Sequence, residues 1–212
     1  MKNNILIIIF IFYQIIFLNN VFGKEIAFDA TDIEITNNQN LTIANNGIAT
    51  IEDDKIILEG KKIKYFKDQS LIVVSEGKIT KTDQNLEINS KIIEYYIEDG
   101  KINFTNEVKI EDKSNSLDIF SDKINYNIKD KIILSDGNSK IIDEFQNTYD
   151  LAKFEYSIKD KVIKLSKTKV IDKDKNRFDL EIAYLDLNKK EIVAKDIGLN
   201  FKISENSDNE PR

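Results

Sequence analysis

The residue types that usually carry catalysis are missing from this sequence, and its acidic residues gather in polar stretches. The 212 residues include no histidine and no cysteine, so the commonest general base, nucleophile and zinc ligands are absent. No Gly-x-Ser-x-Gly sequence or glycine-rich phosphate loop occurs. Paired carboxylates can act as they do in glycosidases, but here solvated turns explain the acidic clusters. We therefore predict that the protein is not an enzyme and has no catalytic residues.

One acidic stretch has the spacing of a metal site. Asp172-Lys173-Asp174-Lys175-Asn176 places oxygen ligands at alternate positions, but it lacks the central glycine and terminal glutamate of a helical calcium loop. A plain turn is the better interpretation, so we expect no metal and no cofactor. The formal charge of −6 is spread with both signs mixed along the chain, which argues against nucleic acid as a partner.

The most regular feature is apolar. In Ser121-Asp122-Lys123-Ile124-Asn125-Tyr126 a small residue precedes two large apolar residues by three and five positions, and the pattern recurs along the chain. The first members of the apolar pairs fall at 33, 63, 93, 124 and 154, which is the regularity of an internal repeat. The five pairs are Ile33/Ile35, Ile63/Tyr65, Ile93/Tyr95, Ile124/Tyr126 and Phe154/Tyr156.

The elements that carry these pairs are predicted to be strands. Polar clusters such as Lys67-Asp68-Gln69 and Lys129-Asp130-Lys131 recur about every 15 residues and have turn composition. The residues between them are rich in Ile, Val, Tyr and Phe and alternate apolar with polar, as strands do. Each repeat is therefore two strands and two turns. The predicted fold is all-β: a folded-over antiparallel sheet, or β-jelly roll, built from about six 30-residue two-strand repeats.

Each strand also changes face at its small residue. Ile56 and Leu58 stand at even positions and Ile63 and Tyr65 at odd ones, with Gly60 between them. Such a change of parity indicates a β-bulge or corner. We predict that every strand bends there, so that the five apolar pairs point into the fold.

The chain begins with an export sequence. After Met1-Lys2-Asn3-Asn4, residues 5–18 are apolar except for Gln14, and Val21 and Gly23 follow at the −3 and −1 positions of a cleavage site. We predict a signal peptide at 1–23, one domain at 24–203 and a polar tail at 204–212. A retained membrane anchor is the alternative, but it would need about 20 residues and so would have to include polar ones.

These repeats resemble a known family. The small residue before an Ile-x-Tyr pair, followed by steps such as Ser75-Glu76-Gly77-Lys78-Ile79 and Ser135-Asp136-Gly137-Asn138, is similar to the OstA-like domain of the lipopolysaccharide (LPS) transport proteins LptA, LptC and LptD. The likeness covers residues 24–212 and is strongest to the periplasmic N-terminal part of LptD. The tail would then be a junction to a C-terminal barrel. The cysteines that LptD proteins often carry are absent.

The resemblance implies a periplasmic, outer-membrane-associated protein that binds LPS in an apolar trough and passes it on. Exposing each CH₂ of an acyl chain to water costs about 0.8 kcal/mol, so such a path must be continuous. The five apolar pairs are the expected trough lining. Ile26, Phe28 and Ala30 lie in an expected edge strand that would pair head-to-tail with an LptA-type bridge protein.

Two other readings stay open. Within the same family, a free-standing LptA-like bridge and a membrane-anchored LptC-like adaptor are the alternatives. Tandem strands also build β-solenoids, such as surface adhesins or polysaccharide lyases. A solenoid is disfavoured because the turn residues change from repeat to repeat, whereas solenoids stack similar residues at fixed turns.

Overall fold

The computed structural model describes residues 24–36 and 38–200. The predicted signal peptide at 1–23, the predicted domain end at 203 and the tail at 204–212 lie outside these residues. Among the residues described, the single short helix is the 3₁₀ turn Lys67–Gln69. No helix in this part of the chain is long and apolar enough to span a membrane.

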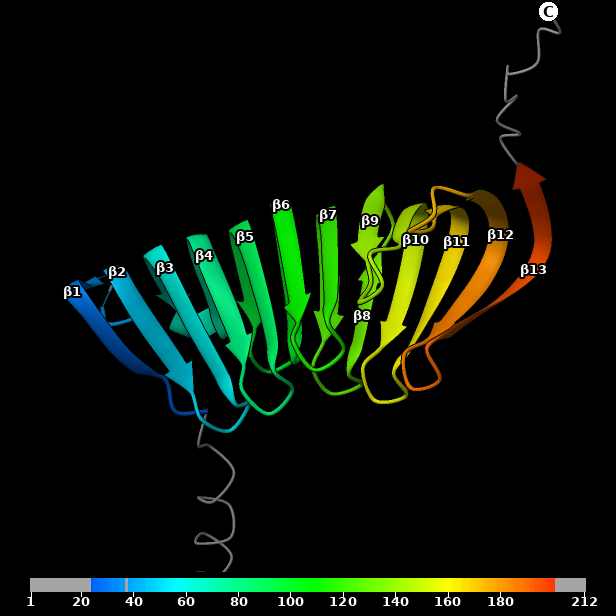
Figure 1. The fold of residues 1–212 in the computed structure, drawn as a ribbon. Coiled ribbons are helices and arrows are strands. Elements are labelled where there is room, and N and C mark those ends of the chain that lie inside the picture. Colours follow the sequence, from blue (N-terminus) through cyan, green and yellow to red (C-terminus); the bar gives the residue numbers. More distant parts are fainter. Residues whose placement is uncertain (1–23, 37, 201–212) are drawn as a thin grey trace, which may run out of the picture.

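The fold is all-β, as predicted, and its strands form one antiparallel sheet (Figure 1). Consecutive strands are neighbours throughout, except that the short strands β8 and β9 lie end to end between β7 and β10. This meander differs from a β-solenoid, in which stacked rungs pair in parallel. The strands are β1 (Ala27–Thr36), β2 (Leu41–Ile51), β3 (Ile56–Phe66), β4 (Leu71–Lys81), β5 (Leu86–Tyr96), β6 (Lys101–Asp112), β7 (Leu117–Asn127), β8 (Ile132–Ser135), β9 (Ser139–Ile142), β10 (Thr148–Ser157), β11 (Val162–Ile171), β12 (Arg177–Asp186) and β13 (Glu191–Asn200).

Most turns between strands place a residue in the left-handed backbone region; this is Gly or Asn in some turns and Lys, Ser or Gln in others. Gly100, in the β5–β6 turn, has φ +67° and Asn85, in the β4–β5 turn, has φ +51°. Glycine adopts this conformation freely and asparagine more readily than most residues. The polar clusters of the sequence therefore mark the places where the chain reverses.

Strands β2 to β7 and β10 to β12 change face at their middle, as the change of parity predicted. In β5 the buried positions alternate up to Ser90, the next two residues are exposed, and alternation resumes at Ile93. β7 repeats this around Ser121. At the change, one residue of most strands drops out of the pairing; Lys61 and Glu76, for example, lie between the pairs Gly60–Gly77 and Lys62–Ser75. Strand β6 is irregular here, since both Asn106 and Glu107 are skipped in its pairing with β7.

Small residues are required at this bend because the chain is crowded there. A Cβ at Gly77 would lie 2.6 Å from the Glu59 carbonyl oxygen and 2.4 Å from Val74 Cγ1. On β5, β7 and β9, serines occupy this position in place of glycines, and their hydroxyls form hydrogen bonds with the backbone. Ser90 Oγ, for example, donates to the Thr105 carbonyl at 2.8 Å. We call this line the bend line; its residues are Gly47, Gly60, Gly77, Ser90, Ser121 and Ser139.

The bend line folds the sheet into two halves that enclose one core. Leu58, Ile88 and Ile119 come from one half and Ile63, Ile93 and Ile124 from the other. All six belong to a single cluster and are at most 1% exposed. The two halves of the sheet are therefore buried against each other, which is the jelly-roll arrangement.

Candidate functional site

The apolar pairs predicted from the sequence lie in two rows that cross the sheet from end to end. Strand pairing places each residue beside its counterpart on the next strand. The first row is Ile33, Ala44, Ile63, Val74, Ile93, Phe104, Ile124, Ser135, Phe154, Leu165, Ala183 and Ala194. The second, the tyrosine row, is Ile35, Thr42, Tyr65, Ile72, Tyr95, Ile102, Tyr126, Ile133, Tyr156, Ile163, Leu185 and Ile192.

Most of the predicted lining residues are fully enclosed. Those that are at most 1% exposed are Ile63, Ile93, Tyr95, Ile124, Tyr126, Phe154 and Tyr156. Tyr65 is half-buried at the margin of the core. The interior is thus a packed layer of side chains in this structure and not an open trough.

The first apolar pair is the exception. Ile33 and Ile35 belong to the same two rows, but they are 45% and 62% exposed. They lie on β1, which pairs only with β2 among the strands described, so no further strand covers them. At the other end of the tyrosine row Ile192 is 40% exposed. Both ends of the apolar interior therefore meet solvent.

The predicted partner edge is the free side of β1. Ile26, Phe28 and Ala30 are half-buried and pack against the core, and the ring of Phe28 lies 6.3 Å from that of Tyr65. Within the described part of the chain β1 and β13 are the two end strands (Figure 1). Their outer edges carry backbone groups with no strand beside them, which is the geometry that edge pairing needs.

The tyrosine row also closes the side of the fold opposite the bend line. Tyr95 on β5 donates its hydroxyl hydrogen to Asp54 in the β2–β3 turn. Tyr126 on β7 donates to Gln84 Oε1 in the β4–β5 turn at 2.8 Å, and Tyr156 on β10 donates to Asp112 at the end of β6. We call this line of contacts the seam and each pair a latch. The latches join the two halves of the sheet across the interior.

The carboxylate members of the latches are held by further contacts. Asp54 accepts a bond of 2.6 Å from Lys24 Nζ, and Asp112 accepts bonds from the backbone N–H groups of Ser114 and Asn115 at 3.0 and 3.1 Å. The Asp54 side chain is only 12% exposed and Asp112 is 3% exposed. The prediction that turn carboxylates are simply solvated is wrong for these two, because tyrosines from the other half cover them.

Sequence reasoning missed these turn residues as members of the site. Asp54, Gln84 and Asp112 recur with nearly the period of the tyrosines, so a signal existed in the spacing. Each latch joins residues 41 to 44 positions apart, which is more than one repeat. No single repeat therefore contains both partners.

Burial sets the ionisation of the latch tyrosines. It raises the pKa of Tyr95 well above the ordinary value, and the hydrogen bond to Asp54 and that negative charge add to the effect. Burial and the charge of Asp112 raise the pKa of Tyr156 in the same way. For Tyr126 burial is the main cause of a raised pKa, and the negative charge of Asp83 adds to it. All three hydroxyls are neutral donors at physiological pH.

The seam differs beyond the third latch. The latch tyrosines stand two steps apart in the tyrosine row, and two steps beyond Tyr156, after Ile163, stands Leu185, which has no hydroxyl. Asp143, in the loop after β9, instead accepts the hydroxyl hydrogen of Tyr149 from its own half at 2.7 Å. An ion pair of 2.9 Å between Glu144 and Lys190 joins this loop to the β12–β13 turn, beside a cavity of about 100 Å³ that Leu185 and Tyr149 help to line.

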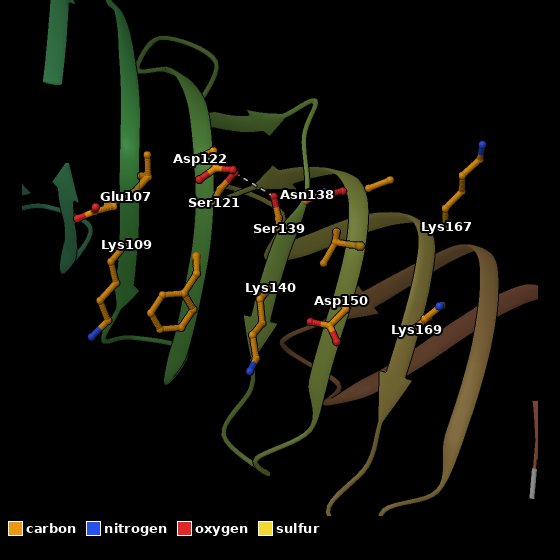
Figure 2. A pocket seen from close by; sticks show the side chains of 14 residues that line it. Glu107, Lys109, Ser121, Asp122, Asn138, Ser139, Lys140, Asp150, Lys167 and Lys169 are labelled. Atoms are coloured by element: carbon orange, nitrogen blue, oxygen red, sulfur yellow. Dashed lines mark hydrogen bonds between the residues drawn. The ribbon is translucent and has the colours of Figure 1, made fainter. Parts of the chain in front are cut away.

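Two grooves lie on the outside of the bend line. One, of about 670 Å³, is lined by polar side chains that include Lys140, Asp150 and Lys169 (Figure 2). These three are cross-strand neighbours of alternating sign. The other groove, of about 740 Å³, surrounds Gly60 and Gly77 and is also rimmed by Lys and Glu. Mixed charge of this kind fits a solvated outer face, so we place the candidate site in the interior and seam.

The stretch considered for calcium forms a turn around its own first carboxylate. Asp172 Oδ1 accepts the backbone N–H groups of Asp174 and Asn176 at 2.9 and 2.8 Å, and Asp172 Oδ2 accepts Asn176 Nδ2. These bonds lower the pKa of Asp172, with the Asn176 side chain contributing most. The carboxylate oxygens are thus used by the turn itself.

Comparison with known proteins gives little beyond the architecture. No model of a protein family matches the sequence, and no curated protein matches it. Among solved structures the chain is similar to LptH, the LptA homologous periplasmic component of the conserved lipopolysaccharide transport device from Pseudomonas aeruginosa. The TM-score is 0.46 and the identity 13%, over 52% of this chain and 80% of that chain. A likeness this low carries no conclusion about function.

Proposed function

We propose that this protein is a periplasmic lipid-conduit element that holds the acyl chains of LPS between the two halves of its folded sheet. The observation that supports this is the pair of largely apolar rows, which cross the sheet from β1 to β13 with Thr42 and Ser135 as their polar members and meet solvent at both ends. A core that only stabilises the fold does not need to reach solvent at its two ends, whereas a path along which acyl chains pass must be accessible at both ends. The resemblance of the repeats to the OstA-like domains points to the same function.

The lining of the path would be the side chains of the two rows. In the present structure these side chains fill the space between the halves, since Ile63, Phe104 and Ile124 are all 0% exposed. Acyl chains therefore need the halves to move apart, which exchanges one apolar contact for another at little cost in exposed area. The sugars and phosphates would stay outside in water.

Neighbouring proteins would continue the path. We propose that the free edge of β1, with Ile26, Phe28 and Ala30, pairs with the sheet of an LptA-type bridge protein. Main-chain hydrogen bonds would provide the affinity, and Ile33 and Ile35 would become covered as the rows extend into the partner. An LptD-like domain, an LptA-like bridge and an LptC-like adaptor would share this contact.

The two ends of the chain also have roles in the proposed function. Residues 1–23 would direct export and be removed, and residues 24–203 would form the conduit domain. Residues 204–212 would lead away from it, toward an outer-membrane barrel in an LptD-like protein. Mass measurement of the protein recovered from cells tests the cleavage after Gly23.

Photo-crosslinking tests the lipid path directly. Benzoylphenylalanine would replace Phe104, which is 0% exposed inside the first row, or Phe120, which lies on the outer face where Lys109 stacks over its ring. The two positions are matched in size and lie on strands β6 and β7. We expect labelled LPS at position 104 and not at position 120. Equal labelling at both positions, or none at 104, would contradict the proposal.

A further inference from the structure

The three latches differ in strength, and the middle one is the weakest. Tyr95 and Tyr156 donate to carboxylates, and such charge-assisted bonds are about twice as strong as neutral ones. Tyr126 donates to the neutral amide oxygen of Gln84. The seam is therefore held least firmly at its centre, between the Asp54 and Asp112 latches.

The same glutamine has an unused donor. Gln84 Nε2 is buried and has no hydrogen-bond partner among the described residues. A buried N–H without a partner is costly and is rare in native proteins. It is also the kind of group that a ligand with a carbonyl or hydroxyl oxygen would satisfy.

We propose that the Tyr126–Gln84 latch is the point where an acyl lipid enters the seam, with Gln84 Nε2 donating a hydrogen bond to an acyl-linkage oxygen of the lipid. This rests on the proposed function and adds an entry site to it. Ester and amide carbonyls and 3-hydroxyl groups stand where an acyl chain meets its headgroup. Such an oxygen would lie at the seam, while the acyl chain of the lipid would lie among the apolar rows.

The local charges fit a neutral acceptor. Asp83 stands next to Gln84 and pairs with Lys81 at 2.5 Å, so the turn presents one balanced ion pair beside the amide. A carboxylate at position 84 would receive the Tyr126 hydrogen as Asp54 and Asp112 do for their tyrosines. It would also lose the donor. The natural glutamine thus keeps the latch weak and supplies a donor for the ligand.

The experiment compares two variants of the full chain with opposite effects on the latch. Tyr126→Phe keeps the ring but removes the bond, and Gln84→Glu strengthens the bond but removes the free donor. Stopped-flow fluorescence would follow uptake of lipid A carrying a fluorescent acyl chain from detergent micelles. We expect uptake to be roughly fivefold faster in Tyr126→Phe, as loss of one net hydrogen bond implies, and slower and weaker in Gln84→Glu.

A distance measurement reports the seam without any lipid. The chain has no cysteine, so nitroxide labels on Thr82→Cys and Lys129→Cys, both exposed turn positions on opposite sides of the latch, can be introduced cleanly. We expect the distance distribution to broaden in Tyr126→Phe and to narrow in Gln84→Glu. Tyr95→Phe should change it less, because the middle latch would still be present.

The outcomes separate the two proposals. If the natural protein takes up no acyl lipid while the label distances respond as expected, the proposed function fails and no entry site exists. If lipid is taken up but neither variant changes the rate, the entry site is wrong and the conduit stands. An increase in uptake with Gln84→Glu would also overturn the entry site.

Discussion

The two long edges of the folded sheet are built from different chemistry. At the bend line the chain is continuous, and glycines and serines allow backbone segments to approach where a Cβ would lie 2.6 Å from a carbonyl oxygen. At the seam the halves are separate pieces of chain joined by tyrosine side chains and turn residues. The lipid path proposed above needs the first edge to stay fixed and the second to open, and so it depends on this difference.

The substitution with the largest expected effect, Ile124→Asp, tests whether the seam keeps water out of the interior. Ile124→Asp places a carboxylate at a position that is 0% exposed. We expect the free energy of unfolding in urea to fall by about 4–5 kcal/mol, because the charge would be buried and unpaired. The exposed neighbour Lys123→Asp is the control and should cost far less. A loss under about 2 kcal/mol for Ile124→Asp would mean that water already enters between the halves.

Alkaline pH should weaken the seam and spare the bend line. An unfolded tyrosine ionises near pH 10, and burial raises the pKa of Tyr95, Tyr126 and Tyr156 in the folded protein. The stability due to these neutral hydroxyls is therefore full below pH 10 and is lost as the pH rises above it. For the three together we expect up to about 4 kcal/mol lost per pH unit. Tyr156→Phe should make this slope shallower in a series of urea titrations, and an unchanged slope would contradict the assignment.

A substitution at the bend line should cost somewhat less but should be independent of pH. In Gly77→Val the new side chain meets Val74 and the Glu59 carbonyl, and such overpacking costs about 3 kcal/mol. Gly137→Val is the matched control, because nothing lies within 4 Å of a Cβ at that glycine. Thermal unfolding of both variants would measure the difference. Equal losses would show that crowding does not define the bend line.

The smallest effect concerns the ion pairs outside the bend line. Lys61 and Glu76 pair across it with side chains that are 67% and 58% exposed. Exposed pairs of this kind contribute little, so Lys61→Ala should change the free energy of unfolding by under about 0.5 kcal/mol. A loss above 1 kcal/mol would mean that these charges, and not the small residues, stabilise the bend.

Local patterns in the sequence were enough to predict the repeat, the strands and the bend. Alternation of apolar residues, turn composition and the parity change at Gly60 and Ser121 each depend on residues close together in the chain. The latches depend on how the two halves align after folding, and no local pattern encodes that. The exposure of Ile33 and Ile35 escaped prediction for a related reason, since it follows from the position of β1 at the end of the sheet.

Local sequence patterns also did not predict the interruption between β8 and β9. The step Ser135-Asp136-Gly137-Asn138 resembles the glycine-containing steps of earlier repeats, but here it divides one strand into β8 and β9. The hydroxyl oxygens of Ser121, Ser135 and Ser139 lie 3.0 Å from one another at this point. This cluster, of which Figure 2 shows Ser121 and Ser139, takes the place that glycines hold elsewhere on the bend line.

The meander order of the strands has a consequence for how the chain folds. Apart from β8 and β9, each strand pairs with the strands next to it in sequence, and even the latches join residues no more than 44 positions apart. The contact order is low for a β protein, so folding can nucleate in any pair of repeats and propagate along the stack, as in other quasi-one-dimensional proteins. The smallest cooperative unit is set by the reach of a latch, about one and a half repeats. The export proposed for this chain would therefore allow it to fold progressively from whichever end emerges first.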